Sequence, residues 1–322
     1  MALKDIISPY KSDLDQINQN LDAFLLDETT PEIRAISEHL LAAKGKQLRP
    51  LLGVLFFHAF NGKNPEKMHY VMAAIESIHM ASLIHDDIID GSEKRRGQDS
   101  VYHRFGQDPA IISGVYVYSS ALKLIAKSGD LTVLNKISET VKQLCQGELI
   151  QLFNRDDSIY SMSQYENICT HKTGVLFACA CYSGTHLATQ NEETAMKSYD
   201  FGIHLGKLFQ LVDDYLDLFG SQKDLKKDPL QDIANGDITL PIIVLYHSLS
   251  DSAKDTFHHA KKSIQDFKDY LSEALDSSIK TQCLAVISQS LEQADTAFVS
   301  STRESLLLSK IKSEIVKRCE GL

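Results

Sequence analysis

The chain has 322 residues, 43% of them hydrophobic, and a formal net charge of −10 at pH 7. This length could hold two domains, but the ordinary hydrophobic content supports one large core, so we predict a single domain over residues 1–322. The acidic balance argues against a nucleic-acid partner, because binding to a phosphate backbone depends on a basic face.

Cysteine and hydropathy patterns carry no sign of zinc binding, export or membrane insertion. The six cysteines include no Cys-x-x-Cys pair, so there is no zinc signature. The N-terminus lacks the apolar stretch of a signal peptide. Apolar runs such as Leu240–Tyr246 are too short to cross a bilayer. We therefore expect reduced thiols, a cytoplasmic location and no transmembrane segment.

Apolar residues recur at helical spacing along the whole chain, and no convincing alternating strand pattern occurs. A polar loop is expected from Gly220 to Gly236, followed by about three or four further helices. Ser163 and Glu166 match a capping box. Before this loop, the second predicted helix begins at Thr29 or Thr30, before Pro31, and the fourth runs from Pro65 to the first aspartates. The other helices predicted before the loop cover residues 10–27, 50–60, 108–127, 131–154, 163–188 and 192–219.

The stretch from Glu76 to Gly97 carries the first chemical signal. Three carboxylates share one helix end and one face, because Asp86 and Asp90 are one turn apart and Asp87 precedes Asp90 by three residues. Unpaired carboxylates so close together repel one another, and a hard cation such as Mg2+, which also bridges to phosphate oxygens, relieves the repulsion. The side chains that follow suit a phosphate group: Lys94, Arg95 and Arg96.

A second aspartate motif repeats this geometry further along the chain. Asp213 and Asp217 are one turn apart, and Asp214 faces with them. A single such segment could be a solvated acidic helix end. Two of them, each at the end of an apolar run, are hard to explain in that way. The pair predicts a metal–diphosphate site built from two facing helices rather than from duplicated domains.

Two further segments contain basic residues that are candidates for a binding site. Lys46 and Arg49 are three residues apart at a predicted helix entry, so both can reach one anion, although a solvated basic loop is the alternative. Lys172 and Thr173 fall in the middle of a predicted helix among apolar residues. A buried ammonium group there needs a partner.

With these motifs in this order, the chain resembles the trans-isoprenyl (polyprenyl) diphosphate synthases of the medium- and long-chain type over nearly its whole length. The resemblance implies the isoprenoid synthase fold, an all-α single-domain bundle of about 12–14 helices around a central cavity. It also implies a Mg2+-dependent prenyltransferase that condenses isopentenyl diphosphate with farnesyl or geranylgeranyl diphosphate. A homodimer is the expected assembly, and a heteromer with a smaller subunit is the alternative.

The resemblance also assigns roles to individual residues. Isopentenyl diphosphate is expected at Lys46, Arg49, His79 and Arg96. The allylic diphosphate is expected at Arg95 and Lys172, and Lys227 is expected to be a further substrate-binding cation. Thr173 is expected beside the reacting carbons, and Gln210, one turn before the second aspartates, is expected among the catalytic residues. The metal ligands and catalytic carboxylates are expected to be Asp86, Asp87, Asp90, Asp213, Asp214 and Asp217.

Two positions depart from the family pattern. Asp99 puts a negative charge close to an expected anion site, and Asp237 replaces a frequent lysine, so one phosphate cation is expected to be missing.

Product length is expected to depend on the helix turn before the first aspartates. Ala81 and Ser82 lie one turn before Asp86, and Ile78 lies two turns before it, so they would line the wall that the growing chain passes. Because Ala and Ser are small, we predict products of about thirty carbons or more, as in quinone side chains. A shorter product of fifteen to twenty carbons is the alternative, in which these residues are small only for helix packing.

Three other functions have weaker support in the sequence. Glu76-x-x-His79 has the spacing used in di-iron bundles, but the other copy, Glu66-x-x-His69, lies on the same predicted helix rather than a separate one. A class I terpene cyclase normally has an Asn/Ser/Glu-type second motif, whereas the second motif here is rich in Asp. A non-catalytic regulatory subunit need not keep two intact aspartate motifs.

Overall fold

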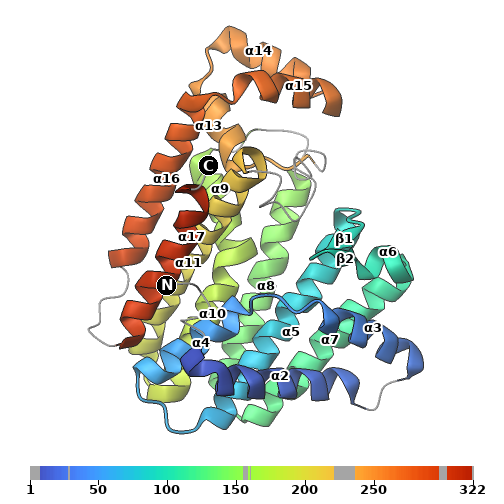
Figure 1. Ribbon diagram of the computed structural model, residues 1–322, viewed down its shortest axis with the longest axis vertical. Helices are drawn as coiled ribbons and strands as arrows, with labels where there is room; N and C mark the ends of the chain where they lie inside the picture. Colours follow the sequence, from blue (N-terminus) through green and yellow to red (C-terminus); the bar gives the residue numbers. More distant parts are fainter. Residues whose placement is uncertain are drawn as a thin grey trace. The chain divides into compact units, whose positions relative to one another are not determined.

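The computed structural model describes residues 8–27, 30–154, 159, 161–220, 236–296 and 303–320. Among these residues the regular secondary structure is helical apart from one short hairpin (Figure 1). The elements, in chain order, are η1 (Ser8–Tyr10), α2 (Lys11–Leu26), α3 (Pro31–Ala42), α4 (Leu48–Ala59), α5 (Pro65–Ile89), β1 (Lys94–Arg95), β2 (Gln98–Asp99), α6 (Val101–Phe105), α7 (Gln107–Ser128), α8 (Leu131–Phe153), α9 (Met162–Cys169), η2 (Thr170–Gly174), α10 (Val175–Thr189), α11 (Glu192–Phe219), α13 (Leu240–Ser248), α14 (Asp251–Ala260), α15 (Ile264–Ala274), α16 (Ser277–Thr296) and α17 (Arg303–Glu320).

The chain divides into two compact units. Unit 1 contains residues 1–142, 175–203 and 297–311, and unit 2 contains residues 143–174, 204–296 and 312–322. The single domain expected from the sequence stays a prediction. The first aspartate motif belongs to unit 1 and the second belongs to unit 2, so each motif is described within its own unit.

Helix α5 is the central helix of unit 1. It packs along α7 and also contacts α2, α4 and α10 (Figure 1). All residues from Val71 to Ile78 are buried, as expected for a helix that is apolar on every side. Gly114 of α7 lets the two helices approach closely, because a Cβ there would lie 2.2 Å from Nε2 of His85. This close contact with α7 fixes the C-terminal end of α5, which carries the first aspartate motif.

Unit 2 is built around the C-terminal half of α11. Tyr215 of α11 and Phe257 of α14 are among its fully buried side chains. Helix α13 packs against α16, and α14 packs against α15. The second aspartate motif lies in the last two turns of α11, beside this core.

The helix boundaries confirm most of the predicted segments and correct three details. Thr30 caps α3, with Pro31 in its first turn. The predicted helix over 163–188 is interrupted, because residues Thr170–Gly174 form a π-helical turn. The predicted capping box at Ser163 and Glu166 is wrong: Ser161 is the N-cap and pairs reciprocally with Gln164. The third helix begins at Leu48, two residues before the expected Pro50.

Helix α7 is, among the described residues, the one helix whose length and hydropathy would allow it to cross a membrane. Its apolar window is 44% buried in the protein, and the helix packs on α5. The buried side of α7 is thus part of the core of unit 1. Four large apolar side chains on α7 are exposed: Ile111, Ile112, Val115 and Leu122.

Candidate active site

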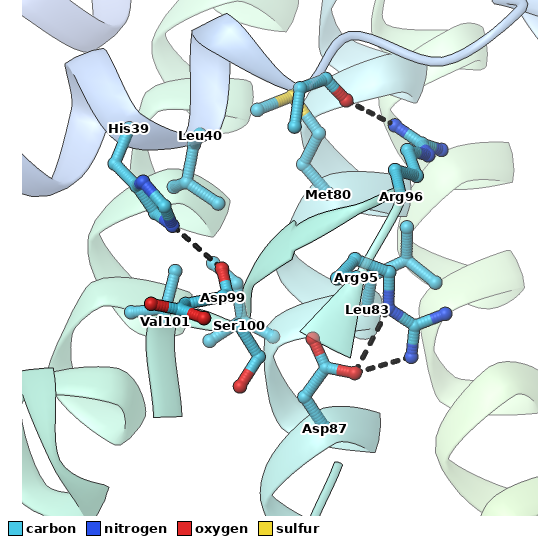
Figure 2. A pocket seen from close by; sticks show the side chains of 12 residues that line it. His39, Leu40, Met80, Leu83, Asp87, Arg95, Arg96, Asp99, Ser100 and Val101 are labelled. Carbon is cyan, nitrogen blue, oxygen red and sulfur yellow. Dashed lines mark hydrogen bonds and ion pairs between the residues drawn. The ribbon is translucent and has the colours of Figure 1, made fainter. Parts of the chain in front are cut away.

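The first aspartate motif forms the C-terminal end of α5, and its carboxylates differ in exposure. Asp86 and Asp90 are partly exposed, whereas Asp87 is 3% exposed. Nε of Arg95 donates to Oδ1 of Asp87 at 2.9 Å, and the second guanidinium nitrogen, NH2, contacts the same oxygen (Figure 2). The arginine expected to bind the allylic diphosphate is therefore already oriented by a buried carboxylate.

The two-residue turn between β1 and β2 directs Arg95 and Arg96 to different hydrogen-bond partners. Arg96 (φ 53°) and Gly97 (φ 80°) both have left-handed backbone conformations, as required for a tight hairpin between β1 and β2. Arg96 donates to the carbonyl of Ala43 at 3.0 Å (Figure 2). Its guanidinium lies over Gly45, where a Cβ would be 2.6 Å from Cζ. A side chain at position 45, directly before Lys46, would therefore displace the guanidinium of Arg96 from this place.

Asp99, which the sequence left without explanation, pairs within the hairpin. Lys94 and Asp99 are cross-strand partners, and Nζ of Lys94 donates to Oδ1 of Asp99 at 2.5 Å. The carbonyl oxygen of Asp99 also lies 2.8 Å from Nε2 of His39 (Figure 2). The negative charge of Asp99 is thus matched by Lys94.

Arg49, Arg96, His79 and Glu76 form one electrostatic cluster in unit 1. Glu76 is 3% exposed, and burial raises the pKa of its carboxyl, while Arg49 and Arg96 oppose this shift. Burial lowers the pKa of His79 well below its ordinary value, and the charges of Arg49, Arg96 and Arg95 lower it further. Arg49 also lies over the ring of Phe177, 4.6 Å from its centroid. The cluster offers two guanidinium groups and a neutral imidazole to an anion.

A small pocket lies beside this cluster, between α3, α5 and the hairpin (Figure 2). It brings together Asp87, Arg95 and Arg96 of the predicted site. Lys46, Arg49 and His79 are not among its lining residues. Lys46 is exposed at the start of α4, where it is accessible to a ligand in solution.

The second aspartate motif shows the same division between exposed and buried carboxylates. Asp213 and Asp217 are partly exposed, whereas Asp214 is 4% exposed. Nε2 of Gln210 donates to Oδ1 of Asp214 at 2.7 Å, and the hydroxyl of Tyr165 donates to Oδ2 at 2.5 Å. Asp213 accepts from the guanidinium of Arg318 at 2.9 Å.

Lys172 and Thr173 lie in the π-helical turn, a geometry frequently found at functional sites. The ammonium group of Lys172 has the partners that the sequence required: it donates to Oε1 of Gln151 at 2.8 Å and lies 3.4 Å from the carboxylate of Glu148. The hydroxyl of Thr173 donates to Oε1 of Gln210 at 2.7 Å. Three predicted residues, Thr173, Gln210 and Asp214, are thereby connected.

The loop residues and the chain-length residues complete the set predicted from the sequence. Lys227 lies outside the described residues. Asp237 is 8% exposed, so this side chain is largely buried. Of the chain-length residues, Ile78 and Ala81 are 3% and 4% exposed, and Ser82 is partly buried with its hydroxyl bonded to the carbonyl of His79 at 2.9 Å.

Three contacts of the site were not predicted from the sequence. The partner roles of Tyr165, Glu148 and Arg318 depend on contacts between residues that are far apart along the chain. Glu148 and Gln151 lie in a segment that fits a recurring family pattern but is equally well explained by helix packing. For Tyr165 and Arg318 no sequence signal was available.

The partly exposed carboxylates suit a magnesium ion whose coordination shell is completed by oxygens of the substrate. Among the described residues, no group of three or more His, Cys, Asp or Glu side chains is close enough to hold a metal by itself. Mg2+ typically takes only one or two protein carboxylates and fills its other positions with water and phosphate oxygens. A guanidinium group already pairs with Asp213, so this carboxylate accepts a cation.

Comparisons with known proteins agree with this chemistry. Residues 30–275 match the polyprenyl synthetase family. Component 2 of the heptaprenyl diphosphate synthase of Geobacillus stearothermophilus is 32% identical over 251 residues, which are 78% of this chain and 77% of the relative. The octaprenyl diphosphate synthase of Escherichia coli is 31% identical over 239 residues, 73% of each chain.

Solved structures show the same fold. A polyprenyl synthase of Caulobacter crescentus, in complex with calcium and isoprenyl diphosphate, matches with a TM-score of 0.91 and 26% identity, covering 98% of this chain and 97% of that one. The fold and the paired aspartate motifs thus define an all-α protein of the isoprenoid synthase type. The chain belongs to the polyprenyl synthetase family.

Proposed function

We propose that this protein is a Mg2+-dependent prenyltransferase that adds isopentenyl diphosphate to an allylic diphosphate, farnesyl or geranylgeranyl diphosphate. One observation carries the proposal: the carboxylates of Asp86 and Asp90 at the end of α5 are followed by the oriented arginines Arg95 and Arg96. This arrangement combines sites for a divalent cation and a diphosphate on a single unit. The relatives named as heptaprenyl and octaprenyl diphosphate synthases support it.

Each group in the site has a defined task in this reaction. In this proposal Arg95, Lys172 and Lys227 would bind the allylic diphosphate. The first and last aspartates of each motif would hold the metal, because the middle ones, Asp87 and Asp214, are buried. When bound, Mg2+ acts as a Lewis acid that stabilises the diphosphate leaving group. Lys46, Arg49, Arg96 and neutral His79 hold the diphosphate of isopentenyl diphosphate, so that its double bond faces the allylic carbon.

The chemical step needs no protein nucleophile. The allylic C–O bond breaks, the double bond of isopentenyl diphosphate attacks the allylic carbon, and a proton is then lost to the departing diphosphate. The hydroxyl of Thr173 is fixed by Gln210, and we assign both residues to the surroundings of the reacting carbons. We expect an apolar lining beside the reacting carbons to exclude water, which would otherwise hydrolyse the allylic cation.

We further propose a product of about thirty carbons or more, because the side chains at positions 81 and 82, one turn before the first aspartates, are small. Relatives are named for both long and short products. A short chain isoprenyl diphosphate synthase of Methanothermobacter thermautotrophicus is 30% identical over 259 residues, 79% of this chain and 78% of the relative. The shorter product therefore remains the second candidate.

A cytoplasmic homodimer is the proposed form of the enzyme. The exposed apolar side of α7, formed by Ile111, Ile112, Val115 and Leu122, is a suitable contact surface, since large exposed apolar patches mark interaction sites. The relatives named as component 2 of a heptaprenyl synthase favour a heteromer as the second candidate. Light scattering of wild type and of an Ile112→Glu, Val115→Glu variant distinguishes a dimer from a monomer.

The activity is tested with purified protein, farnesyl and isopentenyl diphosphates and Mg2+, followed by identification of the lipid products. A series of all-trans polyprenyl diphosphates is expected. Conversion of the allylic substrate alone into a cyclic hydrocarbon would instead identify a terpene cyclase. If product forms only after a second protein is added, the heteromer is the active form.

A further inference from the structure

The middle aspartate of the second motif has surroundings that differ from those of its two neighbours. Asp213 has 43% of its side chain exposed and Asp217 is partly exposed, whereas Asp214 is 4% exposed. Helical periodicity explains the difference, because residues 213 and 217 share a face and residue 214 is turned by about 100° from residue 213. The sequence spacing alone assigned all three to one face.

Both oxygens of Asp214 accept hydrogen bonds from three different helices. Oδ1 accepts from Gln210 at 2.7 Å, and Oδ2 accepts from the Tyr165 hydroxyl at 2.5 Å and from the backbone N–H of Leu240 at 3.2 Å. Tyr165 is 3% exposed and Leu240 is fully buried. A carboxylate has about four lone-pair sites, and these donors occupy three of them, so a metal at Asp214 would compete with buried hydrogen-bond donors.

The network continues from Asp214 to the π-helical turn. Gln210 donates to Asp214 through its amide N–H and accepts from Thr173 at 2.7 Å through its amide oxygen. Thr173 follows Lys172, whose ammonium group is held by Gln151 and Glu148. Asp214 therefore connects the end of α11, helix α9, the start of α13 and the turn that carries Lys172 and Thr173.

We propose that Asp214 is not a metal ligand and that Tyr165, Asp214 and Gln210 form a brace. In this role Tyr165 is a positioning residue: it holds Asp214, which orients Gln210 and Thr173 and keeps Asp213 and Asp217 on the outer side of α11. The brace replaces the sequence-based expectation that Asp214 binds Mg2+. The brace rests on the proposed function, because it assigns different roles, metal binding and positioning, to residues of the same proposed site.

The first experiment measures metal binding rather than turnover. Mn2+ is titrated into wild-type protein in the presence of inorganic diphosphate, and its binding is followed by calorimetry and electron paramagnetic resonance. Asp213→Asn is expected to weaken Mn2+ binding at least tenfold. Tyr165→Phe and Asp214→Asn are expected to keep the Mn2+ affinity within about threefold of wild type. An equal loss in the Asp213→Asn and Asp214→Asn variants would overturn the brace.

The second experiment separates positioning from a general effect on stability. Tyr165→Phe is expected to lower kcat about tenfold, at temperatures well below its melting point, with KM for isopentenyl diphosphate within twofold. Tyr182→Phe is the matched control, since Tyr182 is a buried tyrosine whose hydroxyl also donates to a carboxylate, Glu192, at 2.5 Å. This control is expected to keep kcat. An unchanged kcat in Tyr165→Phe overturns the brace, whereas a wild type that forms no prenyl product overturns the proposed function.

Discussion

Arg318, near the end of the last helix, donates to Oδ1 of Asp213 at 2.9 Å. The two residues are 105 positions apart in the sequence. Both side chains are about two-fifths exposed, and the Arg318 guanidinium lies 5.8 Å from the centroid of the Phe209 ring. Asp213 of the second aspartate motif is thus paired with a cation of the protein itself.

This pair predicts competition between Arg318 and the metal at Asp213. Exposed ion pairs contribute about 0.2–1 kcal/mol, so Arg318→Gln should tighten Mn2+ binding without diphosphate by about fivefold at most. The measurement is a Mn2+ titration at low and high salt. Lys317→Gln is the matched control, because Lys317 pairs with Glu314 instead. Weaker Mn2+ binding by Arg318→Gln than by the control would show that Arg318 does not compete.

The exposed aspartates are predicted to be essential for turnover. Asp86→Ala and Asp213→Ala should each lower kcat by at least about a hundredfold, because the metal supplies much of the stabilisation of the leaving group. Both side chains are partly exposed, so the fold should be retained. Circular dichroism checks that the helical content stays near wild type. Near-normal turnover in either variant would contradict the metal assignment.

The two diphosphate sites are predicted to respond to different substitutions. Lys46→Ala and Arg49→Ala should raise KM for isopentenyl diphosphate, by about 1.5–3 kcal/mol per charge-assisted contact. Arg95→Ala should mainly raise KM for the allylic diphosphate. Steady-state kinetics with each substrate varied in turn make the comparison. If every variant affects both substrates equally, the two sites have been assigned wrongly.

Part of this site could be read from the sequence, because its signals are local. The aspartates one turn apart on α5 and α11 and the need of Lys172 for a partner follow from spacing and burial. Tyr165 could not be predicted, since its contact with Asp214 joins residues 49 positions apart. The π-helical turn at Thr170–Gly174 also has no periodic signature, so the sequence predicted one unbroken helix.

His79 is predicted to make the stability of the protein depend on pH. Burial and then Arg49, Arg96 and Arg95 lower its pKa from the ordinary 6.5, so the folded state keeps the imidazole neutral while the unfolded chain takes up a proton. The stability that this group contributes is complete above pH 6.5 and is lost as pH falls towards the lowered pKa. Glu76, whose pKa is raised, acts in the opposite direction.

The difference between two proteins isolates the effect of His79. Thermal melts of wild type and His79→Gln at about pH 7.5 and pH 5.5 should show a smaller loss of Tm on acidification in the variant. Glu76 is present in both proteins, so its contribution cancels to first order. An equal or larger loss of Tm in His79→Gln would mean that His79 is not held neutral.

Product length is predicted to depend on Ala81. This residue is 4% exposed on α5, one turn before Asp86, and Ile78 on the preceding turn is 3% exposed. Each added isoprene unit buries about five carbons, worth about 3–4 kcal/mol if fully enclosed. A ring that blocks this path should therefore stop elongation firmly. Ala81→Phe or Ala81→Tyr should shift the main product to about fifteen or twenty carbons while the first condensation stays fast.

A buried alanine leaves little space for a ring, so the length test needs a second position. Overpacking of a core typically costs about 1–3 kcal/mol, and thermal melts of the Ala81 variants measure this cost. Ser82→Phe is the companion variant, because Ser82 is only partly buried and lies on the next position of the same turn. Chromatography of the dephosphorylated products gives the lengths. A wild type that stops at fifteen carbons, or folded aromatic variants at both positions with unchanged products, would show that this side of α5 does not limit the chain.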